Sequence, residues 1–309
     1  MTYMAPSAPL TIGGVLDEWL HLFRESFSRC WTLALVVVVT GGALVMLVTP
    51  TLPSVNLPVW QNHLQMWSLL NGPQNALAVV IQGLIGLWVT GALFAEQIAL
   101  TRGQHLTTGE ALRTGWRRLP HMLLGFLLLG LIIGAVMIPI FIVAIMAGVM
   151  AHAAMLEAAS HGAVIAVVIV IALGAVAAVI YLSVRLQLWQ AALFSESGGA
   201  ATALGRSWRL VKGHWWRVTI IMFVAGIVMS ILGFVLPWGI GIALGVFATH
   251  GVQTADAVRY LRIVQFISQA ARLITLPLTT AVSIAIFRDL TLRREGGDLA
   301  ARAEALSGS

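Results

Sequence analysis

Charged side chains are scarce in this chain. Only 10% of its 309 residues are Asp, Glu, Lys or Arg, and 59% are hydrophobic, whereas soluble proteins carry charge on about a quarter of their residues. A soluble fold of this length could not bury so much apolar surface. The single cysteine, Cys30, excludes an intramolecular disulfide. No short basic stretch opens the chain ahead of its first apolar run, so we interpret that run as a retained membrane span.

The sequence also lacks residue groupings that would support catalysis or metal binding. The serines at 195, 197 and 207 have no partnered histidine in a triad-like context. Four histidines on the predicted outer side have spacings that match no zinc-ligand pattern; they are His63, His152, His161 and His250. The net charge of +6 comes from basic residues scattered at helix ends. We therefore predict no metal, no cofactor, no enzymatic activity and no nucleic-acid partner.

Long apolar stretches are what the sequence does contain. A membrane span needs about 20 apolar residues to cross a hydrocarbon core of about 30 Å. The stretches cover residues 31–50, 77–100, 121–150, 163–193, 218–247 and 268–287. We predict an all-α integral membrane protein with about six transmembrane helices. It would form a single membrane domain over residues 1–309, with a short cytoplasmic tail from Thr291 in which Asp298 caps a last short helix.

Most Lys and Arg residues fall on one side of the predicted membrane, whereas Arg259 and Arg262 fall in the last outer loop. The majority precede the first span, lie between spans two and three and between spans four and five, and follow span six. The loops at 51–75 and 151–162 contain neither residue. Because short cytoplasmic loops retain positive charge, we predict a multi-pass protein of the bacterial inner (plasma) membrane with both termini in the cytoplasm.

The predicted cytoplasmic segments resemble one another. Each contains an amphipathic helix ahead of an outward span, and Trp19, Trp116 and Trp208 fall at comparable places in these three interfacial helices. We predict a threefold parallel internal repeat about an axis along the membrane normal. Its units are about 1–105, 106–197 and 198–309. The alternative is that any three helical hairpins with interfacial tryptophans look alike.

Several sequence stretches carry a family resemblance. They are Ile12–Asp17, Glu110–Leu112, Ala203–Gly213, Phe287–Leu290 and Arg294–Leu299. With them the chain resembles the membrane domain found in front of some glycerophosphoryl diester phosphodiesterases, and free-standing bacterial six-span proteins of the same group. The resemblance implies a six-helix membrane domain without an established biochemical role. It does not imply the phosphodiesterase reaction, because the chain has no His-Arg-Gly element and no room for the catalytic barrel.

Ionisable residues within the spans are the first candidates for a functional site, because they are costly in a membrane. Glu96 and Arg185 lie at similar predicted depth, which suggests an ion pair between them. Arg272 follows a polar row that includes Gln265 and Gln269. Arg185, or Arg272 with Gln269, would hold an anionic group such as a lipid phosphate. The alternative is a structural ion pair, with side chains that extend to the membrane interfaces.

Basic residues of the predicted interfacial helices are candidate contacts to anionic lipid. They are Arg113, Arg117, Arg118, Arg206, Arg209, Lys212 and Arg217. The small-residue spacings Gly130/Gly134 and Gly241/Gly245 permit close helix contact, within the bundle or in a homodimer.

These observations favour a non-enzymatic membrane protein with a lipid-associated or partner-binding role. The expected partners are membrane lipids, above all anionic phospholipids, and a protein partner or a second copy of the chain. The alternative is a transporter or lipid-moving protein with a polar path near Arg272. Spans one, three and four are almost wholly apolar, which speaks against a wide aqueous pathway. An intramembrane enzyme would need a cluster of polar side chains that the spans do not supply.

Overall fold

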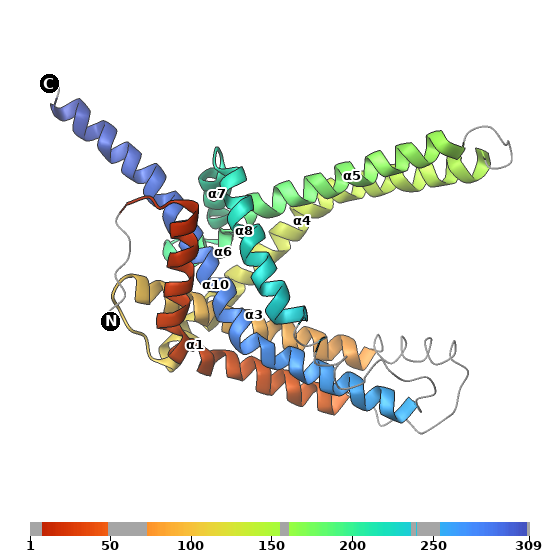
Figure 1. The fold of residues 1–309 in the computed structure, drawn as a ribbon, viewed down its shortest axis with the longest axis horizontal. Helices are drawn as coiled ribbons and strands as arrows, with labels where there is room; N and C mark the ends of the chain where they lie inside the picture. The colour runs from red at the N-terminus through yellow and green to blue at the C-terminus, as the bar shows by residue number, and fades with distance from the viewer. Residues whose placement is uncertain (1–7, 49–72, 155–160, 236–238, 240–253, 308–309) are drawn as a thin grey trace. The chain divides into compact units, whose positions relative to one another are not determined.

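The computed structural model describes residues 8–48, 73–154, 161–235, 239 and 254–307. All regular structure in these residues is helical (Figure 1). The helices are α1 (Ile12–Val48), α3 (Pro73–Thr101), α4 (Thr108–Ala154), α5 (His161–Leu186), α6 (Trp189–Ser195), α7 (Ala200–Val211), α8 (Trp215–Ser230), the π-helical turn η1 (Ile231–Val235) and α10 (Thr254–Ser307). The chain forms two compact units. Unit 1 comprises Met1–Leu119 and Ile220–Ser309, and unit 2 comprises Pro120–Thr219.

Six segments of these helices are long and apolar enough to cross a membrane. They are Ile12–Ala43, Ala76–Thr101, Thr108–Met146, Ile169–Ser195, Trp215–Gly233 and Ile267–Arg294. This confirms the prediction of an all-helical structure with six helices long and apolar enough to span a membrane. The single-domain organisation and the threefold repeat stay predictions.

The first predicted interfacial helix and the first predicted span form one element. Helix α1 runs from Ile12 to Val48 without interruption, although Figure 1 shows that it bends along its length. The Thr32 hydroxyl donates to the Arg29 carbonyl at 2.7 Å, and such side-chain bonds to the preceding turn favour helix bending. A change in polarity along a sequence does not interrupt backbone hydrogen bonding. The same continuity joins the second interfacial helix to its span in α4.

Proline does not end the long helices either. Pro139 lies inside α4 and Pro277 inside α10, whereas Pro50 and Pro237 lie outside the described residues. Helix α10 continues to Ser307. Asp298 therefore lies within α10 and does not begin the separate last helix that we predicted.

In unit 1, helices α1, α3 and α10 pack on one another, and η1 packs against α10. The buried face of α1 repeats at steps of three and four residues, as a helix with one protein-facing side requires. Its members are Val15, Trp19, Leu22, Ser26, Cys30, Leu33 and Val37. Three residues of this face, Cys30, Leu33 and Val37, form a hydrophobic cluster with residues of α3 and α4. The other members are Val89, Ala92, Leu93 and Ala111.

A tight turn brings the start of α4 back onto α3. Gly103 adopts a φ of +70°, a conformation that favours glycine, and the Gln104 N–H donates to the Ala99 carbonyl at 2.9 Å, as in a Schellman motif. Thr107 and Glu110 then cap α4 reciprocally, since the Glu110 carboxylate accepts the Thr107 N–H at 2.8 Å and the Thr107 hydroxyl accepts the Glu110 N–H at 3.3 Å.

Unit 2 contains the short helix α6, which packs on α7, and α5 also contacts α7. Five of the seven residues of α6 are buried; they are Trp189, Ala191, Ala192, Leu193 and Phe194. The Trp189 ring lies directly over Gly125 of α4, where an added Cβ would be only 2.3 Å from the ring. The long apolar stretches of α4 and α5 expose most of their side chains, as segments that face lipid do.

Candidate functional site

Arg185, in the last turn of α5, lies among aromatic rings of unit 2. Its guanidinium carbon is 4.4 Å from the centre of the Trp208 ring and 5.0 Å from that of Tyr181. The Trp215 ring in turn lies 6.0 Å from the Tyr181 ring. A cation within about 6 Å of a ring centre is attracted to its face. We call Arg185, Tyr181, Trp208 and Trp215 the Arg185 bracket; its members come from α5, α7 and α8.

Two nitrogen atoms of the Arg185 bracket are buried without a hydrogen-bond partner among the described residues, namely Nε of Arg185 and Nε1 of Trp215. Within the described part of the chain, Arg185 also has no ion pair. Unit 2 contains only two acidic residues, Glu157 and Glu196. Glu196 pairs with Arg206 at 2.8 Å, and Glu157 lies outside the described residues. In the part of the chain that the structure describes, the bracket thus presents donors and positive charge without a carboxylate.

Ser207 fixes the main chain at Arg185. Its hydroxyl donates to the Arg185 carbonyl at 2.9 Å and accepts the Leu188 N–H at 3.2 Å, and its side chain is fully buried. The backbone groups where α5 ends and α6 begins would otherwise lack partners. Because Trp208 directly follows Ser207, helix α7 holds Arg185 both at its backbone and at its guanidinium.

The other basic residues near α7 lie at its surface. Arg209 and Lys212 are exposed, whereas Arg206 and Arg217 are half-buried. Trp216, beside Arg217, is 73% exposed. In unit 1, the predicted lipid contacts of α4 are also accessible: Arg113 and Arg117 are exposed and Arg118 is half-buried.

Glu96 and Arg185 have partners other than those predicted. Glu96 lies in unit 1, where its carboxylate is 3.7 Å from Arg29 Nη1, and its side chain is only 4% exposed. Arg29 also donates to Nδ1 of His105. The prediction placed Arg29 ahead of the first span, but the continuous helix α1 carries it to the level of Glu96.

A buried polar core in unit 1 was not predicted from the sequence. The Gln97 amide of α3 donates to the Ser26 hydroxyl at 3.2 Å and to the Pro277 carbonyl at 2.9 Å. The Trp19 indole donates to the Leu278 carbonyl at 2.9 Å. These donors tie α10 to α1 and α3 at the proline of α10, and all of their side chains are buried. The signals in the sequence were the polar side chains of Ser26 and Gln97, whereas α10 contributes backbone carbonyl groups that no residue type reveals.

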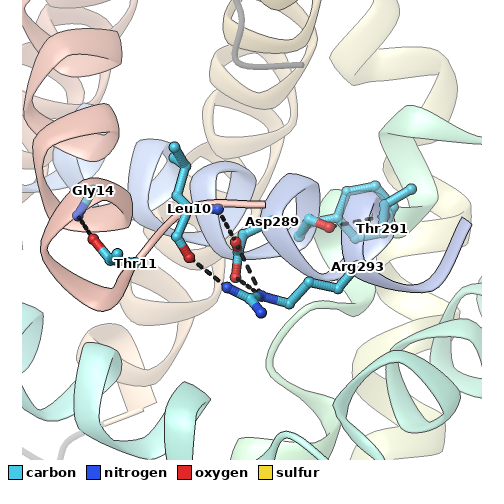
Figure 2. A network of polar contacts seen from close by, with 7 residues as sticks. Leu10, Thr11, Gly14, Asp289, Thr291 and Arg293 are labelled. Atoms are coloured by element: carbon cyan, nitrogen blue, oxygen red, sulfur yellow. Dashed lines mark hydrogen bonds and ion pairs between the residues drawn. The ribbon is translucent and has the colours of Figure 1, made fainter. Parts of the chain in front are cut away.

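A second polar network in unit 1 joins the start of α1 to α10 (Figure 2). The buried Asp289 carboxylate accepts the Leu10 N–H at 2.9 Å and pairs with Arg293 at 3.1 Å. Arg293 also donates to the Leu10 carbonyl, and Thr11 caps α1 by accepting the Gly14 N–H at 3.1 Å. We call Leu10, Asp289 and Arg293 the terminal clasp. It brings together the opening and closing stretches on which the family resemblance was based.

Gln269 and Arg272 differ in their surroundings, and a shared site for them stays a prediction. Gln269 lies against Gly41 of α1 together with Gln82 of α3: an added Cβ at Gly41 would be 3.0 Å from Gln269 Oε1 and 2.8 Å from Gln82 Nε2. Arg272 is exposed. The Gln265 side chain, also in the predicted row, lies outside the described residues.

No group of three or more His, Cys, Asp or Glu side chains in the described part of the chain is placed to hold a metal ion. His63 and His250 lie outside that part. Cys30 is buried and unpaired.

The chain matches one protein-family model, described as a domain of unknown function, DUF7847, over residues 31–290. No curated protein and no solved structure matches it. Nothing in these comparisons links the chain to phosphodiesterase membrane domains, so that resemblance stays a prediction. The matched region extends from within α1 into α10 and covers most of the chain. The protein therefore belongs to the DUF7847 family.

Proposed function

We propose that this protein is a non-enzymatic, multi-pass protein of the bacterial inner membrane that binds anionic phospholipid at the surface formed by α7 and the start of α8. One observation carries the proposal: most of the basic residues of unit 2 lie on this surface, and basic residues outnumber acidic ones in the unit. Its basic residues are Arg185, Arg206, Arg209, Lys212 and Arg217, against Glu157 and Glu196 as its only acidic residues.

The chemistry of this surface suits a lipid headgroup region. Each Lys or Arg close to an anionic leaflet contributes about 1 kcal/mol to membrane binding, and tryptophan is enriched at membrane interfaces. Trp208 and Trp216 are 38% and 73% exposed beside Arg209 and Arg217. This arrangement also supports a cytoplasmic location of α7, since positive charge is retained on that side.

We also propose that α7 and the first turns of α1 and α4 are the three interfacial helices of a threefold repeat. Support comes from α7, which separates a buried face from an exposed one. Its buried residues are Ala200, Ala203, Leu204, Ser207, Leu210 and Val211, whereas Trp208 and Arg209 are exposed.

The transporter alternative has less support. In unit 1 the Gln82 and Gln269 side chains lie at one end of α1 and α3, and Glu96 and Gln97 lie at the other end of α3. The hydrophobic cluster of Cys30, Leu33, Val37, Val89, Ala92, Leu93 and Ala111 lies between them along both helices. A packed apolar cluster of this kind opposes a continuous polar path.

Native mass spectrometry of the detergent-purified protein tests the proposal. Phosphatidylglycerol and phosphatidylcholine with identical acyl chains are added in equal amounts, and the bound fractions of each are compared. We expect preferential retention of phosphatidylglycerol, and less preference in the Arg209→Gln/Arg217→Gln variant. Thr202→Ala, also on α7, is the uncharged control. Equal retention of both lipids by the wild-type protein would overturn lipid binding, and a hydrolysed lipid in the spectrum would overturn the non-enzymatic assignment.

A further inference from the structure

We infer that the Arg185 bracket is a specific site for the phosphate group of one anionic phospholipid molecule. The inference rests on the lipid-binding function proposed above and goes beyond a general charge preference, because it assigns one binding position. Arg185 lies within the candidate span Ile169–Ser195. An arginine at such a position is costly unless it pairs with an opposite charge or extends to the interface.

Among the described residues, the surroundings of Arg185 supply rings but no counterion. Tyr181 and Trp208 attract the guanidinium, and its Nε is buried without a hydrogen-bond partner in the described part of the chain. The described acidic residue of unit 2, Glu196, is already paired with Arg206. An anion from outside the chain would therefore complete the site.

Phosphate fits the donors that remain. A guanidinium offers a planar fork of N–H groups that matches two oxygen atoms of a phosphate. The indole N–H of Trp215 is a further donor in the bracket, also without a partner among the described residues. A free phosphate ion shares this chemistry. The bracket favours the phosphate of a lipid over a free phosphate ion. Tyr181 and Trp208 are 40% and 38% exposed near the end of the apolar helix α5, where the acyl chains of a lipid would lie beside them.

Ser207 acts as a positioning residue for this site. Its two hydrogen bonds fix the backbone at Arg185 and Leu188, and the adjacent Trp208 contacts the guanidinium. A site of this kind is precise when its supporting residues are locked by packing and hydrogen bonds. Loss of the Ser207 hydroxyl should therefore weaken lipid binding without removing any group that touches the lipid.

The test is a titration of phosphatidylglycerol against the purified protein, with the bound molecules resolved one by one by native mass spectrometry. Wild type should bind a first molecule more tightly than later ones. Arg185→Ala should weaken that first affinity by about tenfold or more, since a charge-assisted hydrogen bond contributes about 1.5–3 kcal/mol. Arg185→Lys should be intermediate, and Ser207→Ala should cause a smaller loss. Arg24→Ala removes the same charge from an exposed position of α1 in unit 1 and should leave the first molecule tightly bound.

Each outcome has one meaning. If Arg185→Ala and wild type bind the first phosphatidylglycerol equally, the rings alone stabilise Arg185 and the inference is wrong, while the general preference for anionic lipid stands. If wild type shows no preference for phosphatidylglycerol over phosphatidylcholine, the proposed function fails first. If inorganic phosphate displaces the lipid at comparable concentration and its effect disappears in Arg185→Ala, the ligand is a free anion and the lipid assignment is overturned.

Thermal unfolding of every variant checks that the fold is retained, and Thr202→Ala controls for loss of a hydroxyl from α7.

Discussion

Gly115 offers a sharp test of how closely α3 and α4 pack in unit 1. A Cβ added at Gly115 would lie 2.7 Å from the Ala92 nitrogen and 2.7 Å from the Trp88 carbonyl oxygen. Both are backbone atoms and cannot rotate away. Carbon contacts are most favourable at about 3.5 Å or more, so the two helices would have to separate by most of an ångström at this point.

The expected cost of Gly115→Ala follows from that displacement. Overpacking of a well-packed interface costs about 1–3 kcal/mol. The Trp88 indole donates to the Leu112 carbonyl at 2.8 Å, one turn before Gly115, and weakening this bond adds up to about 1 kcal/mol. Alanine is the better helix former by about 1 kcal/mol, which offsets part of the cost. We expect a net destabilisation of about 2 kcal/mol.

The assay is thermal unfolding in detergent micelles, followed by the fluorescence of the protein's tryptophans. The matched control is Gly86→Ala in α3, where no atom lies within 4 Å of the added Cβ and helix propensity should leave stability unchanged or higher. Gly115→Ala should melt well below wild type, with faster hydrogen exchange in the turn at 102–107. If the two variants melt together at the wild-type temperature, the close approach of α3 and α4 is not real.

Further predictions concern the polar contacts of unit 1 and the orientation of the chain. Asp289→Ala should destabilise the protein by about 3 kcal/mol, because it breaks a buried charged pair and leaves the Leu10 N–H without its acceptor; hydrogen exchange that stays slow in the first turn of α1 would contradict this. Trp19→Phe should lower stability by about 1–2 kcal/mol through loss of the hydrogen bond to the Leu278 carbonyl, measured by thermal unfolding, and an unchanged melting temperature would show that this bond contributes nothing. A fluorescent reporter fused after α10 should be active in the cytoplasm, and activity of a periplasm-dependent reporter at the same position would reverse the predicted topology.

Hydropathy and charge distribution predicted the spans because both depend on composition over about 20 residues. They could not predict where a helix ends. Trp19 was predicted to lie in an interfacial helix and Arg29 ahead of the first span, yet backbone hydrogen bonding continues through both residues into the span in α1. The same holds at Asp298. The polar stretch around it was predicted to be a tail with a separate short helix, whereas α10 continues through this residue.

The sequence could not predict which side chains contact one another in the fold. Arg185 stood out in the sequence as an ionisable residue within a candidate span, but its neighbours on α7 and α8 are known only from the folded unit 2. Glu96 was expected to pair with Arg185 from similar depth, and it pairs with Arg29 across the α1–α3 contact. Gln97 was overlooked, since one amide in an apolar helix gives no pattern until its acceptors on α1 and α10 are known.

The terminal clasp has a consequence for how the protein is made. Unit 2 is a continuous stretch of chain, from Pro120 to Thr219, so all of its contacts become available while synthesis is still in progress. Unit 1 is different, because α1 packs on α10 and Leu10 bonds to Asp289. Helix α1 must therefore wait, with Leu10 and Trp19 lacking their partners on α10, until α10 has left the ribosome. Long-range closure of this kind is slow, and it makes α10 the helix whose arrival completes the fold.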